Sequence, residues 1–394
     1  MRPILLGLAA VAAAGCEAGS APASTSRDSL GVTIVESTAP SWAEGDEWRI
    51  VEEPVVDLAE SGSGDMHLFF RVGDVLRTPA GDLAVTDRGS QQIRIYDVEG
   101  RFLRAFGGAG EGPGEFRSLW SMVLTHQGTL LGVDYRPGGP GAEFDIVSGL
   151  ISTFRLLGEA NPVQHPVPSD IVWGLEAGYT VQDDDLEGGL QRHPATVVRM
   201  SADRTSVHPV ATVPGWEHVV VPEGDAIPLM PRVTQVVPTG RGEVVLGIAE
   251  ALEYSILDGE TGEVRMIARL PGIWLAVTGE DVDRERQARL GPNPSPFTRD
   301  LLDRLPVPTE KPAYQSMLVD IEGNVWAGEY LGIARMDEPQ DWYVWDASGV
   351  WLGMVETPAR FELMRVGSDA VFGVRRDMND VEHPQVLRLV KPRS

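Results

Sequence analysis

Residues 81–116 read GDLAVTDRGSQQIRIYDVEGRFLRAFGGAGEGPGEF and contain three short runs of β type separated by turns. The run DLAVTD ends on an Asp-Arg-Gly-Ser turn, QIRIYDV alternates apolar and polar residues, and FLRAFG follows the next glycine turn. A unit of this size cannot bury both faces of a sheet by itself. The stretch therefore predicts further copies of the same unit along the chain.

The same stretch resembles an NHL repeat, the blade unit of a family of β-propellers. The resemblance rests on the step Val85-x-Asp87, on Arg94-Ile95 and Tyr96-Asp97, on the Glu99-Gly100 turn, and on the glycine-rich exit FGGAGEGPGEF. It implies a ring of four-stranded blades. The exit could be mistaken for a phosphate-binding loop, but it opens no helix, and we interpret it as the turn between two blades.

Later copies share the order of elements rather than the motif. Each has an apolar strand, a glycine turn, a strand that ends in an acidic or polar loop, and then further alternating strands. The turn glycines are Gly81, Gly128, Gly178, Gly242, Gly323 and Gly367. This pattern predicts an all-β fold, a six-bladed β-propeller of four-stranded antiparallel blades, and resembles the six-bladed propeller lipoproteins of bacteria. A seven-bladed ring is the alternative, because divergent blades are easily miscounted.

The sixth copy runs out of chain after three strands. An unassigned β-like run, WRIVEEPVVDL at residues 48–58, precedes the first copy. Placing it beside residues 385–390 completes the last blade with an N-terminal strand and leaves no open sheet edge.

Composition limits the partners that this chain can have. The 394 residues carry a formal net charge of −25, with 44 glycines and 29 prolines. Such an acid excess repels the phosphate backbone, so we expect no nucleic-acid partner. The partner that we expect is therefore an unknown protein or a small-molecule ligand. We expect this chain itself to be a monomer.

The N-terminus has the features of a secretory signal. A basic start is followed by the apolar residues 4–14, which are too few to span a bilayer. The end of this run resembles a bacterial lipobox, which implies a signal peptide at residues 1–15 and a lipid on Cys16, the one cysteine of the chain. Glu17 favours the outer membrane. Plain secretion or a periplasmic location, after cleavage behind Ala12-Ala13-Ala14, is the alternative.

Residues 16–42, rich in Ala, Ser, Thr and Pro, are expected to be a flexible tether with one short extended piece, and the propeller to fill residues 43–394. Two long insertions interrupt the later copies, at residues 214–231 and about 272–312. In the second, Thr278 can cap a helix that has an acidic first turn and ends with Arg289 before Gly291. We expect both insertions on the top face, as a rim or lid over the channel, or as decoration without a ligand.

The same face should carry the loops that follow the second strand of each blade. Their charged side chains could bind a polar ligand or a divalent cation, Ca²⁺ or Mg²⁺. Each acid could instead cap its own turn. The candidate ligand-binding residues are Asp87, Arg88, Asp134, Arg136, Asp184, Glu329, Arg376 and Asp377.

Catalytic and cofactor motifs are missing from the sequence. The seven histidines have no metal-ligand spacing, and there is no nucleophile elbow or P-loop. We therefore expect an envelope-anchored, non-enzymatic binding propeller. A lactonase-like or lyase-like enzyme with a divalent cation in the channel mouth is the alternative, and it needs ligands on the innermost strands. Candidates there are Asp74, Asp170, Glu176, Gln235, Gln315 and Glu362.

Overall fold

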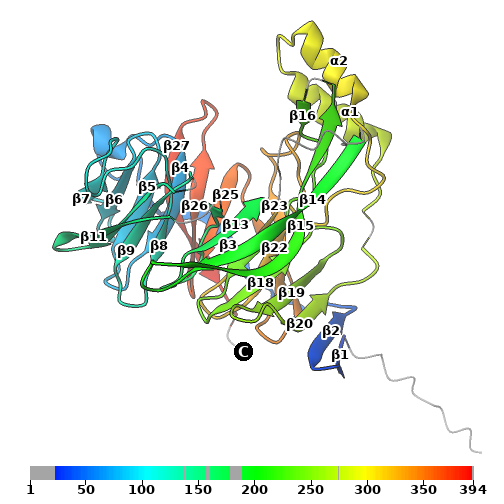
Figure 1. Ribbon diagram of the computed structural model, residues 1–394, viewed down its shortest axis with the longest axis horizontal. Helices are drawn as coiled ribbons and strands as arrows, with labels where there is room; N and C mark the ends of the chain where they lie inside the picture. The colour runs from blue at the N-terminus through cyan, green and yellow to red at the C-terminus, as the bar shows by residue number, and fades with distance from the viewer. Residues whose placement is uncertain are drawn as a thin grey trace, which may run out of the picture.

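The computed structural model describes residues 23–136, 138–156, 160–177, 189–222, 224–273 and 275–392. The chain is an all-β protein of mainly antiparallel sheets with four or more strands each, the architecture of a β-propeller. Figure 1 shows the sheets standing around a common centre, with two helices held above them. Within the described ranges, no helix is long and apolar enough to cross a membrane.

The first two sheets are meanders in which each strand pairs with the next one along the chain. The three runs quoted from residues 81–116 are confirmed as the second, third and fourth strands of the first sheet. These sheets contain β4 (Val72–Arg77), β5 (Leu83–Asp87), β6 (Gln92–Tyr96) and β7 (Phe102–Gly107), then β8 (Leu119–Leu124), β9 (Leu130–Asp134), β10 (Pro140–Asp145) and β11 (Gly149–Arg155).

The turn glycines between first and second strands have a backbone reason. Gly81, Gly128, Gly242 and Gly323 have φ values of 96°, 84°, 83° and 93°. This left-handed region is disfavoured for residues with a Cβ, so the glycine marks the same turn in the first, second, fourth and fifth sheets. Gly178 lies outside the described residues, and Gly367 does not have a positive φ.

The third sheet departs from the prediction. Its strand order is β12-β13-β14-β15-β16. The run at residues 170–176, expected as its first strand, supplies the second strand, β13 (Trp173–Ala177), because the short β12 (Asn161–Pro162) takes the edge position. The insertion at residues 214–231, expected as a loop, is largely strand. It continues β15 (Val207–Val221), which pairs with the long β14 (Gly189–Met200), and then forms β16 (Gly224–Ala226).

The last three sheets follow the predicted order. Their strands are β17 (Gln235–Pro238), β18 (Glu243–Gly247), β19 (Glu253–Asp258) and β20 (Val264–Arg269); β21 (Ser316–Val319), β22 (Val325–Gly328), β23 (Gln340–Trp345) and β24 (Trp351–Thr357); and β25 (Phe361–Val366), β26 (Ala370–Arg376) and β27 (Glu382–Val390), joined by β3 (Arg49–Asp57).

The strand β3 forms the contact expected of residues 48–58. It pairs antiparallel with β27, from Arg49 opposite Val390 to Asp57 opposite Gln385. Side chains add to this pairing, because Gln385 donates from Nε2 to Asp57 at 2.7 Å. A single-turn 3₁₀ helix at Asp65–His67 then leads into the first sheet.

The tether prediction needs correction. Within residues 16–42, β1 (Ser24–Ser29) and β2 (Val32–Ser37) form a hairpin, and β2 adds parallel to β20 at the edge of the fourth sheet. An ion pair between Glu36 and Arg269, at 2.8 Å, joins the two strands. Ordered chain therefore begins much earlier than composition suggested. The signal peptide and Cys16 lie outside the described residues.

The core is divided among clusters of buried apolar side chains, each shared by two sheets. Among the described residues, one such cluster joins every sheet to the next, including the last to the first. Representative pairs are Ile95 and Met122, Val133 and Met200, Val197 and Val244, Tyr254 and Trp345, Trp326 and Leu389, and Val85 and Val374.

The predicted helix in the second insertion is confirmed as α1 (Gly279–Leu290). Thr278 caps it in a reciprocal capping box with Asp281, and it ends before Gly291. A second helix, α2 (Pro296–Arg304), follows. Both helices pack on the upper part of the third sheet through Val219, Leu229, Val282, Leu302 and neighbouring apolar residues.

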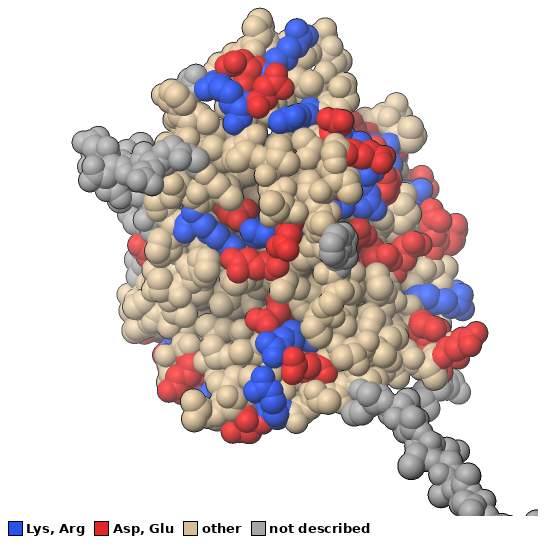
Figure 2. All heavy atoms as spheres, turned by 90° about the vertical axis from the view of Figure 1, so that its right-hand side faces the viewer, with Lys and Arg blue, Asp and Glu red and all other residues tan. Residues whose placement is uncertain are grey.

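These elements form a projection that we call the arm. It comprises β14 before Pro194, β15 after Pro214, β16 and both helices, and Figure 1 shows it rising above the sheets. Figure 2 shows acidic and basic side chains intermixed on its outer surface, consistent with ion pairs such as Arg304–Asp300 at 2.9 Å. The outer side of the helices is thus a solvated surface, and their apolar sides support the strands.

Candidate functional site

The arm joins the third sheet at an interruption in the β14–β15 ladder. Pro194 lies opposite Pro214, and the register shifts between Arg192 and Pro194. Proline has no backbone N–H, so this position cannot make the usual ladder hydrogen bonds. The interruption acts as a bulge that bends the strand pair and exposes backbone carbonyls to side chains.

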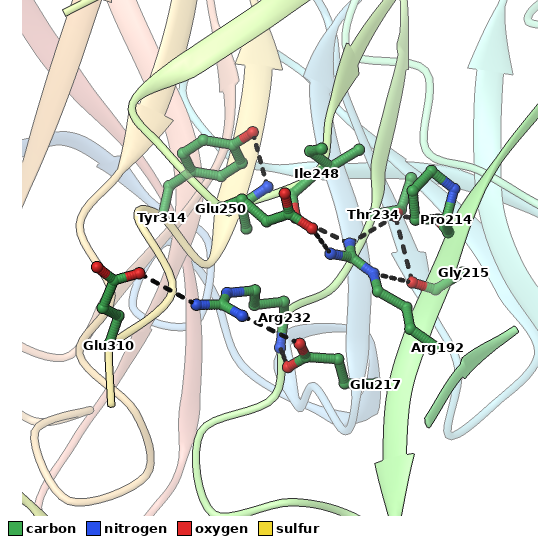
Figure 3. Close-up of polar contacts among 11 residues, drawn as sticks. Arg192, Pro214, Gly215, Glu217, Arg232, Thr234, Ile248, Glu250, Glu310 and Tyr314 are labelled. Carbon is green, nitrogen blue, oxygen red and sulfur yellow. Dashed lines mark hydrogen bonds and ion pairs between the residues drawn. The ribbon is translucent and has the colours of Figure 1, made fainter. Parts of the chain in front are cut away.

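Arg192 binds several groups at this bend (Figure 3). Its Nε donates to the carbonyl oxygen of Gly215 at 2.8 Å, and its Nη1 to Glu250 at 3.0 Å. Its Nη2 donates to Thr234 at 3.1 Å and to the carbonyl oxygen of Ile248 at 2.8 Å. One guanidinium therefore ties the arm to the fourth sheet and satisfies carbonyls that the strand ladder leaves open.

A second guanidinium fixes the other side of the bend. Glu217, which is buried, accepts from the backbone N–H of Arg232 at 2.7 Å and from its Nη1 at 3.3 Å. The Nη2 of Arg232 lies 3.7 Å from Glu310. Figure 3 shows the two arginines near each other, with Tyr314 above Arg232 in this view.

A cavity of about 510 Å³ lies beside this bend, within the range of small-molecule sites. Its walls come from four sheets and from the base of the arm. The lining includes Trp120 and Tyr135 of the second sheet, Asn161, Val163, Gln164 and Leu175 of the third, His193, Trp216, Glu217, His218, Asp225 and Ile227 of the arm and its bend, Val233, Gln235 and Val237 at the fourth, and Met317 and Leu318 of the fifth.

The cavity opens on the face that carries the loops between second and third strands, which we call the upper face. Arg360, which lies between the fifth and sixth sheets, joins two of these loops. Its guanidinium contacts Asp337 at 3.3 Å and Asp380 at 3.1 Å, in the corresponding loops of both sheets. Of the two insertions expected as a rim or lid, residues 214–231 supply part of the cavity wall. The described part of the second insertion, residues 275–312, supplies no lining side chain, and its helices pack on the arm instead.

An aromatic group borders the cavity on the second sheet. The ring centroids of Trp120 and Tyr135 lie 4.8 Å apart. The guanidinium of Arg88 lies 3.9 Å from the centroid of the Trp120 ring, and the Nε of Arg88 also donates to the backbone carbonyl of Trp120. Burial lowers the pKa of Arg88, an effect partly offset by Glu362 and Asp74. One face of Trp120 is thus occupied, and Tyr135 is left partly exposed.

Two histidines form part of the opposite wall. His193 and His218 stack with ring centroids 4.8 Å apart and an interplanar angle of 24°. Burial, and to a smaller extent the proximity of His193, lowers the pKa of His218. Two imidazolium charges at this distance would repel each other, which disfavours the state in which both rings are protonated.

An ion pair occupies the centre of the sheets. Arg365 of β25 binds Asp74 of β4 through two hydrogen bonds of 2.8 and 2.6 Å, and also donates to the carbonyl oxygen of Met122 on β8 at 3.1 Å. Both side chains are almost completely buried. Asp74, a candidate cation ligand, is thus engaged by an arginine from another sheet.

His165 is buried near this ion pair. Its Nε2 accepts from the backbone N–H of Trp173 at 3.0 Å. Burial, with a smaller effect of the positive Arg365, lowers its pKa to about 3. The folded protein therefore holds a neutral imidazole that the unfolded chain would protonate below about pH 6.5.

We expect this histidine to make stability depend on pH. Between about pH 6.5 and 3 the unfolded chain binds one more proton at this histidine than the folded chain does. The free energy of unfolding therefore decreases by about 1.4 kcal/mol for each unit by which the pH is lowered. His165→Gln keeps an acceptor for Trp173 and does not titrate. Urea unfolding at about pH 7, 6 and 5 should show a shallower fall for the variant. Parallel curves would contradict the assignment.

The predicted acids of the first two sheets turn out to be structural. Asp87 is buried, pairs with Arg94 at 3.1 Å and accepts from the backbone N–H of Ser90. Asp134 is buried and accepts from the backbone N–H groups of Arg117 and Ser118. Each acid therefore fixes its own loop, as in the alternative interpretation of these residues.

The remaining predicted residues do not converge on the cavity either. Glu329 pairs with Arg335 at 3.1 Å, Arg376 bridges Glu362 and Glu382, and Asp377 caps a turn by accepting from the backbone of Val381. The side chain of Arg136 is exposed next to Tyr135. Asp184 lies outside the described residues.

The expected cation ring is therefore not assembled by these carboxylates. Among the described residues, one group has ligand atoms close enough to share a metal ion, namely Asp57, Glu60 and His383. It lies at the β3–β27 pair, and Asp57 already accepts from Gln385 and from the backbone of Ala59. The other candidate ligands of the channel do not lie together. Glu362 binds Arg376, and Asp170 binds His126. Glu176 lies on the second strand of its sheet, Gln315 accepts from the backbone of Leu331, and Gln235 lines the cavity.

Sequence reasoning missed most of the cavity. Trp120, Asn161, Gln164, His193, Trp216 and His218 belong to no short motif. One signal was available: WEHVVV at residues 216–221 has the composition of a strand, and its extension toward Pro214 predicts a β arm rather than a loop. The partners that meet it across the cavity are distant in sequence.

Comparisons with solved structures support the propeller fold. A protein from Bacteroides fragilis, proposed to be exported, is 11% identical, with a TM-score of 0.50, and the match covers 91% of this chain and 100% of that one. A member of the DUF4221 family from Bacteroides vulgatus is 8% identical, with a TM-score of 0.52 and coverage of 88% and 98%. A gluconolactonase from Xanthomonas campestris is matched more loosely, at 11% identity, a TM-score of 0.41 and coverage of 82% and 87%.

At these identities the likeness concerns the fold alone. No protein-family model and no curated protein matches the chain.

Proposed function

We propose that this protein is a six-bladed, envelope-anchored propeller that binds a small molecule in the cavity of its upper face and catalyses no reaction. The cavity carries this proposal, because it combines a volume of about 510 Å³ with apolar, aromatic and amide side chains from several sheets. The β3–β27 pairing and the clusters between successive sheets support a closed ring of six blades.

The enzymatic alternative has less support. A cation in the channel mouth needs convergent carboxylates, and the most central one, Asp74, is held by two hydrogen bonds from Arg365. Placing a metal ion there would require the arginine to move and leave its charge buried without a partner.

A fluorescent probe tests the cavity as a binding site. N-phenyl-1-naphthylamine should bind the wild-type protein saturably and at one site, with increased emission, because it can bury its rings in the cavity. Val233→Trp places a larger side chain in the lining and should weaken binding at least ~10-fold, or about 1.4 kcal/mol. The control Val147→Trp, at an exposed turn, should bind like the wild type. Equal binding by all three proteins would contradict a site in this cavity.

The anchor has a separate test. Cys16 lies directly after the small residues of the signal and should carry a lipid. Cys16→Ser should therefore leave the membrane fraction or accumulate unprocessed at a larger size. Ser20→Ala, a nearby control, should stay in the membrane fraction at the wild-type size. A Cys16→Ser protein that fractionates and migrates like the wild type would contradict lipidation.

A further inference from the structure

The charged groups around the cavity are already neutralised by the protein. The two arginines beside it, Arg192 and Arg232, are directed to protein acceptors, as Figure 3 shows. Glu217, in the lining, is paired with Arg232. Asp225 lies exposed on β16 at the rim, where water can solvate it. Among the described lining residues, none offers an uncompensated charge inside the cavity.

Such a site discriminates against charged ligands. An anion would find no available cation there, and it would approach a chain with a formal charge of −25. A cation would lose its hydration against Val233, Val237 and Met317. Asp225, the unpaired carboxylate among the described lining residues, is exposed to solvent and cannot compensate for that loss within the apolar part of the cavity. The stacked His193–His218 pair does not favour two positive charges, because both would lie on rings whose centroids are 4.8 Å apart.

Neutral polar groups, in contrast, are available. The half-buried amides of Asn161 and Gln164 line the cavity, and neither side chain has a hydrogen-bond partner among the described residues. A side-chain amide can both donate and accept a hydrogen bond, so these two residues favour a ligand with neutral polar groups.

The lining also offers flat aromatic surfaces. Tyr135 is partly exposed beside Trp120, and the side chain of Trp216 is 58% exposed at the bend of the arm. Aromatic rings of this kind bind planar groups by offset stacking or edge contacts. Below them the cavity is lined by Leu175, Val236 and Leu318.

We propose that the cavity selects an uncharged, ring-containing molecule, which buries its flat apolar part against the aromatic and aliphatic lining and presents hydroxyl, carbonyl or amide groups to Asn161 and Gln164. This inference rests on the proposed binding function and specifies the chemical class of its ligand.

A matched series of naphthalenes tests the class. At about pH 7.5, 1-naphthalenemethanol, 1-naphthaleneacetate and 1-naphthylmethylammonium share one ring and differ in charge. Each is titrated against wild-type protein loaded with N-phenyl-1-naphthylamine. The neutral alcohol should displace the probe at a concentration at least ~10-fold lower than either ion. Displacement by an ion at an equal or lower concentration overturns the ligand class and leaves the cavity as a binding site. Failure of the probe itself to bind overturns both.

The amide contribution is tested by one variant. Gln164→Leu keeps a side chain of similar length and removes the hydrogen-bonding groups. It should reduce the preference for 1-naphthalenemethanol over 1-methylnaphthalene by about 5-fold or more, as expected for the loss of one hydrogen bond, while affinity for 1-methylnaphthalene stays the same or rises. An unchanged preference means that this amide does not contact the ligand and overturns its assigned role.

Discussion

Asp74→Ala should lower the free energy of unfolding by about 3–5 kcal/mol, the usual cost of removing one partner of a buried ion pair. The reason is the position of Arg365, whose guanidinium is nearly inaccessible to solvent and donates to both oxygens of Asp74. Without the carboxylate, Arg365 keeps the Met122 carbonyl as an acceptor but has a buried charge without a counterion. Urea unfolding at neutral pH measures the loss.

A second ion pair between the same two sheets is a matched control. Arg77 of β4 lies 3.2 Å from Asp369 beside β26, and both side chains are substantially exposed. Asp369→Ala should therefore change stability by only about 0–1 kcal/mol. The double variant Asp74→Leu/Arg365→Met removes both buried charges and should recover much of the loss. If Asp74→Ala is as mild as Asp369→Ala, the central pair does not have the role assigned to it.

The fold was largely predictable because its signals are local. A turn glycine with positive φ, such as Gly81, marks the first hairpin of four of the sheets, and alternation along one strand identifies its buried face. The helix α1 was predictable for the same reason, since Thr278 and Asp281 form its cap within one turn. Of the hairpin at Ser24–Ser37, only one short extended piece was predicted, because the strand β1 is polar like a linker and the pairing partner of β2, β20, lies far along the chain.

The site was much less predictable. Asp87 and Asp134 have the residue type and loop position of ligand-binding acids, yet both are buried against their own loops. Sequence alone does not show whether a carboxylate faces solvent or a neighbouring N–H. Likewise, the cavity forms only where Trp120, Gln164 and His218 come together from separate sheets and the arm. These residues are far apart in the sequence, so no spacing between them predicts the cavity.

Removal of β3 should have the other large effect. A chain that begins at Gly64 lacks β1, β2 and β3, and it leaves the backbone donors and acceptors of β27 unpaired along the former contact with β3. It also uncovers apolar residues of the last sheet, because Trp48 and Ile50 pack against the cluster that contains Leu387 and Leu389. We expect this truncation to be insoluble or to melt at a much lower temperature than the intact protein.

A shorter truncation separates loss of ring closure from loss of N-terminal residues in general. A chain that begins at Ala39 loses only the β1–β2 hairpin, whose loss exposes the outer edge of β20 in the fourth sheet. It keeps Trp42, whose backbone N–H donates to Leu352, and it keeps all of β3. This protein should stay soluble and lose little stability. Thermal melting of both truncations is the measurement. Similar melting temperatures would show that pairing with β3 does not close the ring, because only the longer truncation removes a strand of the last sheet.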